Sequence, residues 1–182
     1  MRRATAAGMC IGLVAFLAAC GVSENTRDVD GQQAPAVRGN PTAGRTGPLP
    51  TGGAASCVES YNAKAVQRRA FAFDGVVLSV GRSVSDRGDD GDLGLQGVTF
   101  EVREWFAGGD RDKVTVDLQE PSADEADSSD PNHTYGIGSR LLVSGEARWG
   151  GKPLDHPIAW NCGFSRYYDP ATATAWRNTM LH

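Results

Sequence analysis

The sequence has no hydrophobic stretch long enough to cross a membrane. A transmembrane helix needs about 20 predominantly apolar residues. The apolar run at residues 11–19 is much shorter, and no later stretch approaches about 18 consecutive apolar residues. We therefore expect no membrane anchor made of protein, and any attachment to a membrane must come from another source.

Positive charge is also scarce. The chain has 18 Lys and Arg against 22 Asp and Glu, a formal net charge of −4. From residue 56 to 182 the balance is 13 against 19, which makes −6. Surfaces that bind nucleic acid through its phosphates need the opposite sign. We therefore predict no nucleic-acid partner.

The residues that build metal and catalytic sites are few and scattered. The three histidines, His133, His156 and His182, have no spacing that pairs them as metal ligands or places one beside a nucleophile. We interpret them as surface residues. We predict no catalytic residue, no metal and no cofactor, and an enzyme with a site that sequence does not reveal is the alternative.

One loop is rich in aspartate, a ligand that calcium prefers. It contains Asp86, Asp89, Asp90 and Asp92. The spacing is not that of an EF-hand, and no bidentate glutamate follows at the required position. We interpret the residues as a solvated loop, with a calcium site as the alternative.

What the sequence does contain is a secretory signal at its N-terminus. Arg2 and Arg3 precede the short apolar run, and small residues follow it. The motif Leu17-Ala18-Ala19-Cys20 resembles the lipobox of bacterial lipoprotein precursors. The resemblance implies cleavage after residue 19 and attachment of diacylglyceryl and palmitate-type chains to Cys20. Lipid would then hold the protein on the extracytoplasmic side of the cell membrane. An ordinary secretory signal, with Cys20 as a free thiol, is the alternative.

This assignment determines which cysteines remain available to pair. Of the four cysteines, Cys10 leaves with the signal and Cys20 carries lipid, so Cys57 and Cys162 remain. Disulfides persist in exported proteins, and a leftover pair is most simply one disulfide. Two buried free thiols are the alternative. A two-cysteine metal site lacks the Cys-x-x-Cys spacing or paired histidines that would support it.

Composition divides the remaining chain in two. Residues 21–55 contain seven glycines, four prolines and no aromatic residue. Such a segment cannot bury enough apolar surface to offset the entropy of ordering. We predict that residues 1–19 are the signal peptide, that 20–55 are the lipidated cysteine and a disordered tether, and that 56–182 fold as one domain.

The sequence of the domain predicts a helix, then about five strands, then a second helix. Ser56 and Glu59 fit a capping box, which predicts a helix over 57–69. Asp169 followed by Pro170 predicts a C-terminal helix, with Trp176 on the face that docks on the strands. Apolar alternation and β-forming residues predict strands at 71–80, 98–104, 113–119, 140–147 and 158–162. We predict a mostly β fold, a small five-stranded OB-like barrel with an N-terminal and a C-terminal flanking helix.

The order of these pieces resembles the bacterial TIMP-like, or netrin-like, OB-fold domains. Cys57 and Cys162 frame the matching segments, which are Phe73-Asp74-Gly75-Val76-Val77, Val98-Thr99-Phe100-Glu101-Val102, Val114-Thr115-Val116 and Gly138-Ser139-Arg140-Leu141-Leu142-Val143. The resemblance implies the five-stranded barrel. Animal inhibitors of this type chelate a protease zinc through the free amine of an N-terminal cysteine. Cys57 departs from that pattern because Ser56 precedes it.

These observations predict a non-catalytic, membrane-anchored extracytoplasmic binding module. Its partner would be an envelope protein or a polymer of the cell envelope, and a tethered protease inhibitor acting through loops is a further alternative. The aromatic residues near the C-terminal half offer either a ligand platform or packing between helix and barrel. They are Trp149, Trp160, Tyr167 and Tyr168.

Overall fold

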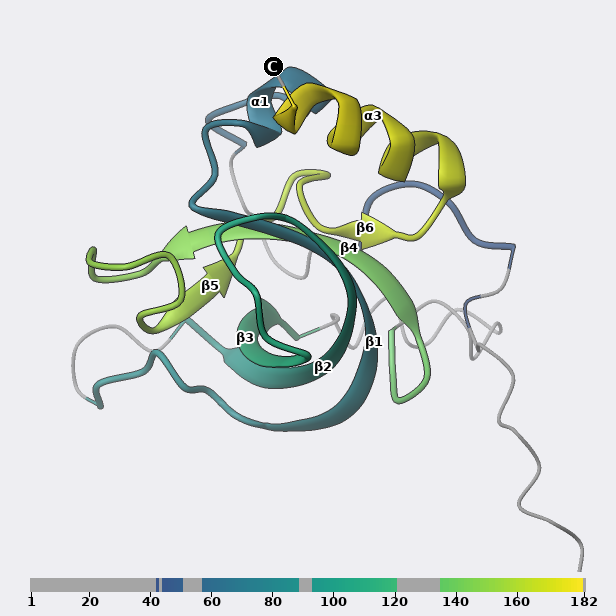
Figure 1. Cartoon of the computed structure of the whole chain (residues 1–182). Helices are drawn as coiled ribbons and strands as arrows, with labels where there is room; N and C mark the ends of the chain where they lie inside the picture. Colours follow the sequence, from purple (N-terminus) through teal and green to yellow (C-terminus); the bar gives the residue numbers. More distant parts are fainter. Residues whose placement is uncertain (1–41, 43, 51–56, 89–92, 121–134, 182) are drawn as a thin grey trace, which may run out of the picture. The chain divides into compact units, whose positions relative to one another are not determined.

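The computed structural model describes residues 42, 44–50, 57–88, 93–120 and 135–181 (Figure 1). Residues 1–41, and with them the signal and Cys20, lie outside the described residues, as do Ser56, His133 and His182. Within the described part of the chain, no helix is long and apolar enough to cross a membrane.

Five strands close into a small OB-like barrel, which confirms the predicted fold class. The strands are β1 (Phe71–Arg82), β2 (Leu95–Ala107), β3 (Lys113–Gln119), β4 (Arg140–Ala147) and β5 (Pro157–Ala159). β1 pairs with β2 and β2 with β3, all antiparallel. β3 pairs with β5 in parallel, β5 with β4 antiparallel, and β4 returns to β1 to close the barrel.

The barrel interior is filled by the side chains that the alternation assigned to it. Val98 and Phe100 of β2, and Val116 and Leu118 of β3, are at most 2% exposed. The ring centroid of Phe73 lies 5.2 Å from that of Phe100 in an edge-on contact. Burying a side chain of this size stabilises the fold by about 1.5–3 kcal/mol. The alternating pattern therefore specifies both the strands and the face that each one buries.

A bulge bends the long strand β1 around the barrel. The pairing of β1 with β2 shifts register between Asp74 and Gly75. A Cβ at Gly75 would lie 3.0 Å from the Phe73 ring and 3.2 Å from the Glu101 carbonyl oxygen. Glycine thus allows the close approach at this bend, as its place inside the predicted strand indicated.

Two helices pack side by side against the barrel (Figure 1). They are α1 (Ala63–Val66) and α3 (Pro170–Met180). In α3, Asp169 is the N-cap and accepts a 2.8 Å hydrogen bond from the Thr172 N–H, as predicted. Trp176 is fully buried, in a cluster that includes Leu142 and Phe164. The predicted docking of the C-terminal helix is therefore confirmed.

The N-terminal helix is shorter than predicted. Residues 57–62 are not helical, and Asn62 caps α1 by accepting a 2.9 Å hydrogen bond from the Ala65 N–H. Glu59 pairs with Arg68 and Arg69, and Ser56, the other half of the predicted capping box, lies outside the described residues. The expected helix over 57–69 is therefore confirmed only for residues 63–66 and is wrong for 57–62 and 67–69.

The last part of the barrel also differs from expectation. The strand predicted at 158–162 ends at Ala159, and a further strand, β6 (Arg166–Tyr167), pairs with β4. Pro48 forms a bridge with Arg166, the Leu49 N–H donates to the Ser165 carbonyl at 3.0 Å, and the Tyr167 N–H donates to Gly47 at 3.0 Å. Residues 47–49, which belong to the predicted tether, thus run beside β6.

Candidate binding surfaces

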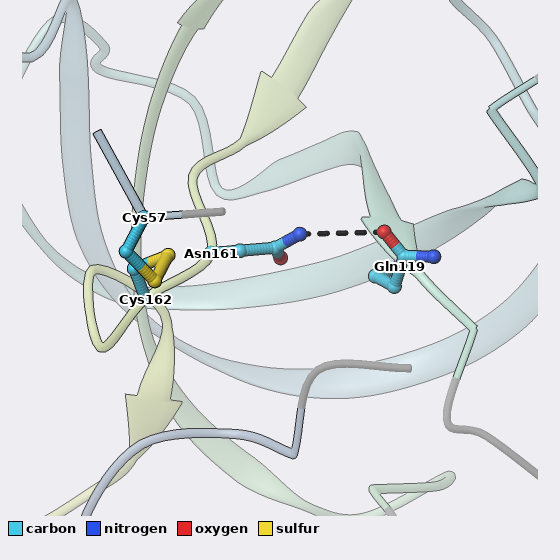
Figure 2. The surroundings of a disulfide bond; sticks show 4 residues. All are labelled: Cys57, Gln119, Asn161 and Cys162. Atoms are coloured by element: carbon cyan, nitrogen blue, oxygen red, sulfur yellow. Dashed lines mark hydrogen bonds between the residues drawn. A yellow bond between two sulfur atoms is a disulfide. The ribbon is translucent and has the colours of Figure 1, made fainter. Parts of the chain in front are cut away.

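The predicted disulfide between Cys57 and Cys162 is present. Their Cα atoms lie 5.8 Å apart and close a loop of 105 residues. The chain-entropy relation assigns about 4.7 kcal/mol, as an upper figure, to a loop of this size. Next to Cys162, the Asn161 side-chain amide donates a 3.3 Å hydrogen bond to the Gln119 side chain at the end of β3 (Figure 2). The disulfide thus fixes the entry to α1 against the connection between β5 and β6.

A pocket of about 670 Å³ lies beside this disulfide. We call it the disulfide pocket. It is lined by Arg45, Pro48, Leu49, Pro50, Cys57, Tyr61, Cys162, Gly163, Arg166 and Tyr167. Three separate stretches of sequence therefore build its walls, and one of them belongs to the segment that we expected to be an unstructured tether. Its volume falls in the range of small-molecule sites.

Among the described residues that line the disulfide pocket, the charged groups are arginines and none is acidic. The Arg166 guanidinium lies 4.4 Å from the ring centroid of Tyr61. Arg45 donates a 3.4 Å hydrogen bond to the Tyr167 hydroxyl and lies over the same ring at 5.4 Å. Within a chain of negative net charge, this pocket is locally positive.

A second surface is built by two connections between strands. We call it the loop surface, and it consists of Val84, Arg87, Arg148, Trp149 and His156. The chain leaving β1 and the connection between β4 and β5 meet on one side of the barrel, at the left of Figure 1. In OB folds these two loops commonly contribute to ligand binding.

Trp149 lies at the centre of the loop surface and is 39% exposed. Its indole N–H donates a 2.8 Å hydrogen bond to the Ser85 carbonyl, which fixes the ring although it reaches solvent. The guanidiniums of Arg87 and Arg148 both lie 4.7 Å from its ring centroid. Such contacts contribute about 0.5–1 kcal/mol at exposed positions. The result is an ordered aromatic side chain flanked by two guanidinium groups.

A buried carboxylate positions the loop that supports Trp149. Asp117 of β3 is fully buried and accepts hydrogen bonds from the Ser83 hydroxyl at 2.5 Å, the Val84 N–H at 2.8 Å, and the Ser85 N–H at 2.8 Å and hydroxyl at 2.6 Å. Sequence analysis did not identify Asp117 as a structural residue, because its partner Ser85 lies 32 residues away along the chain. The available signal was the position of Asp117, a charged residue within the predicted strand at 113–119.

The single described histidine belongs to the same surface. His156 adopts a φ of 50°, and its Nδ1 lies 3.0 Å from the Val84 carbonyl oxygen. The Arg148 N–H donates to the His156 carbonyl at 3.1 Å. His156 thus connects the two loops. Among the described residues no three His, Cys, Asp or Glu side chains gather as metal ligands.

The other aromatic residues pack inside the fold. Trp160 joins the helix-facing cluster, and the Arg69 guanidinium lies 3.6 Å from its ring centroid. Burial lowers the pKa of Arg69, and the charge of Glu146 partly opposes that effect. Tyr167 lies in the barrel core. Of the four aromatics, Trp149 best fits the interpretation as a platform.

An ion pair holds β4 to β1 near the helices. Arg140 donates through Nε to Asp74 Oδ1 at 2.9 Å and through Nη2 to Oδ2 at 2.6 Å. The Asp74 hydrogen bonds raise the pKa of Arg140, and its guanidinium also lies 3.5 Å from the ring centroid of Tyr168. This pair is satisfied within the fold, so we assign it a structural role.

The remaining predicted residues are placed as follows. Asp86 is exposed and accepts from the Gly88 N–H at 3.2 Å, whereas Asp89, Asp90 and Asp92 lie outside the described residues. No protein-family model matches the chain, and no curated protein matches it.

Proposed function

We propose that this protein is a lipoprotein attached to the extracytoplasmic face of the cell membrane through Cys20, and that its barrel is a TIMP-like, non-catalytic binding module. Support for the anchor comes from the signal architecture and the lipobox motif at residues 17–20. Support for the barrel type comes from the closed five-stranded fold with its disulfide between Cys57 and Cys162. Two or more acyl chains on one cysteine suffice for stable attachment.

The observation that carries the binding role is the loop surface. Trp149 is partly exposed yet held by its hydrogen bond to Ser85, and Arg87 and Arg148 lie over its ring. Tryptophan and arginine are the residues most enriched at the energetic centres of protein interfaces. A side chain that is already ordered loses little entropy on binding.

The chemistry of the loop surface favours an envelope protein as the partner. The two arginines of this surface stand among carboxylates, because exposed Asp86 precedes Arg87 and exposed Asp155 precedes His156. The feature that favours a protein partner is therefore not a net positive charge. It is the ordered Trp149 ring with its two arginines, the residue types enriched at the centres of protein interfaces.

Capture from envelope extracts with matched variants tests this role. We expect Trp149→Ala and Arg87→Gln to reduce recovery of a discrete partner at least tenfold, since hot-spot truncations cost about 2 kcal/mol or more. Arg103→Gln is the control, because Arg103 is likewise exposed but pairs with Glu101 on β2. Equal recovery by all variants would exclude the loop surface as the binding site.

The anchor has its own test. Cys20→Ser should move the protein from the membrane fraction to the soluble fraction and leave the melting temperature of the barrel unchanged. Labelling with a palmitate analogue should be lost in the same variant. Retention of the variant in the membrane fraction would contradict attachment through Cys20.

A further inference from the structure

The disulfide pocket combines an apolar wall with positive charge. Pro48, Leu49 and Tyr61 contribute much of the apolar lining, and Arg45 and Arg166 are its charged residues. A pocket with this composition complements a ligand that has an apolar body and an anionic head. Its volume of about 670 Å³ would enclose a small organic molecule and would exclude a folded domain.

Arg166 supplies the second, independent indication. Its Nε is buried and has no hydrogen-bond partner among the described residues. A buried donor without an acceptor is costly, and such groups are rare in folded proteins. The neighbouring Tyr61 ring presents its π face to the guanidinium, which lies 4.4 Å from the ring centroid. Because Nε itself is enclosed by protein atoms, an oxyanion in the pocket would meet the part of the Arg166 side chain that lines the pocket.

We propose that the disulfide pocket binds a small organic carboxylate, with the carboxylate accepted by Arg166 and the apolar body lying against Pro48, Leu49 and Tyr61. Arginine presents parallel N–H groups that match the two oxygens of a carboxylate. Arg45 adds positive charge at the same pocket. This site is separate from the loop surface, so it can be correct or wrong independently of the partner proposed there.

Calorimetric titration of the purified full-length protein with 2-naphthoate tests the proposal. We expect saturable binding at one site, and binding of the neutral isostere 2-naphthamide at least about tenfold weaker, since a charge-assisted hydrogen bond contributes about a tenfold change in affinity or more. No saturable binding of 2-naphthoate, or equal affinity for the two compounds, would overturn the proposal.

Variants locate the site. Arg166→Gln should weaken 2-naphthoate binding about tenfold, and Arg103→Gln, an exposed arginine outside the pocket, should not. Because Arg166 lies in β6, the melting temperature of the Arg166→Gln variant is measured as well, to show that the variant still folds. Arg45→Gln provides a second variant that lies outside every strand and should also weaken binding. Unchanged affinity in both pocket variants would place the ligand elsewhere and contradict the assignment.

Discussion

The disulfide pocket and the loop surface both place arginines over aromatic rings, but the two regions are held together differently. A covalent bond between Cys57 and Cys162 closes one side of the pocket. The loop surface has no covalent link among its described residues and is held chiefly by the hydrogen bonds that Asp117 accepts and the one from Trp149 to Ser85. The first region forms a pocket, and the second presents a partly exposed aromatic ring. The same residue types thus suit a small ligand in one place and a protein in the other.

The difference in construction predicts a difference in how each region fails. Loss of the disulfide releases a constraint on 105 residues, so it should affect the whole fold. Loss of the Asp117 hydrogen bonds should act on the loop that they hold. The predictions below test this contrast in order of decreasing effect on stability.

The largest effect is expected from replacing both Cys57 and Cys162 by serine. Removal of a native disulfide from a small exported domain costs about 2–5 kcal/mol. We expect a loss in that range in the free energy of unfolding, measured by denaturant titration, and disruption of the disulfide pocket. Wild-type protein treated with reductant is the matched control and should show the same loss. A change below about 1 kcal/mol would show that the disulfide does not stabilise the barrel.

A smaller and more local effect is expected from Asp117→Ala. The substitution leaves the buried donors of Ser85 and its neighbours without their acceptor, at a cost of about 1–3 kcal/mol. Amide hydrogen exchange at Val84 and Ser85 should accelerate, and exchange in β4 should not. Asp112→Ala, which changes an exposed aspartate in the turn before β3, is the control. Equal acceleration throughout the barrel would contradict the local role of Asp117.

The prediction of the fold succeeded where the sequence pattern was local. β3 and β4 have the predicted ends because local patterns mark them: apolar alternation in β3, and in β4 the consecutive apolar residues Leu141, Leu142 and Val143. The C-terminal helix was signalled by Asp169 and Pro170, which act within one turn. The disulfide was predicted by counting, because assigning Cys10 to the expected signal and Cys20 to the expected lipid left only one pair of cysteines.

The prediction failed where distant contacts decide the local structure. The helix predicted from Ser56 and Glu59 begins only at Ala63, and the Glu59 carboxylate pairs with Arg68 and Arg69. β6 is only two residues long, so it has no sequence pattern of its own, and it is defined by its pairing with β4. The place of Trp149 beside Ser85 depends on two loops that are 64 residues apart, so no sequence spacing could indicate it.

The smallest effect is a dependence on pH that concerns Tyr135. Burial raises the pKa of Tyr135 to about 12. Its hydroxyl donates to the Gln119 carbonyl at 2.8 Å and accepts from the Gln96 side chain at 3.0 Å. The folded state therefore keeps a proton that the unfolded chain releases near pH 10. This stabilisation is fully present below about pH 10 and is lost as the pH rises toward 12.

We expect the free energy of unfolding of the wild type, relative to Tyr135→Phe, to fall by up to about 2 kcal/mol between about pH 9 and 12. The phenylalanine variant is the control, because it lacks the titrating group and shares every other ionisable residue. A constant difference across this pH range would contradict the assigned burial of the Tyr135 hydroxyl.

The central claim is that the loop surface meets a partner at the membrane, and photo-crosslinking in intact cells tests it most directly. A photoreactive amino acid replaces Val84, which is 41% exposed on the loop surface, in one strain and Val58, which is 89% exposed and follows Cys57, in another, and Trp149 is kept in both. We predict a discrete protein adduct from position 84 in the membrane fraction and none from position 58. Adducts of equal yield from both positions, or none from position 84, would contradict the account.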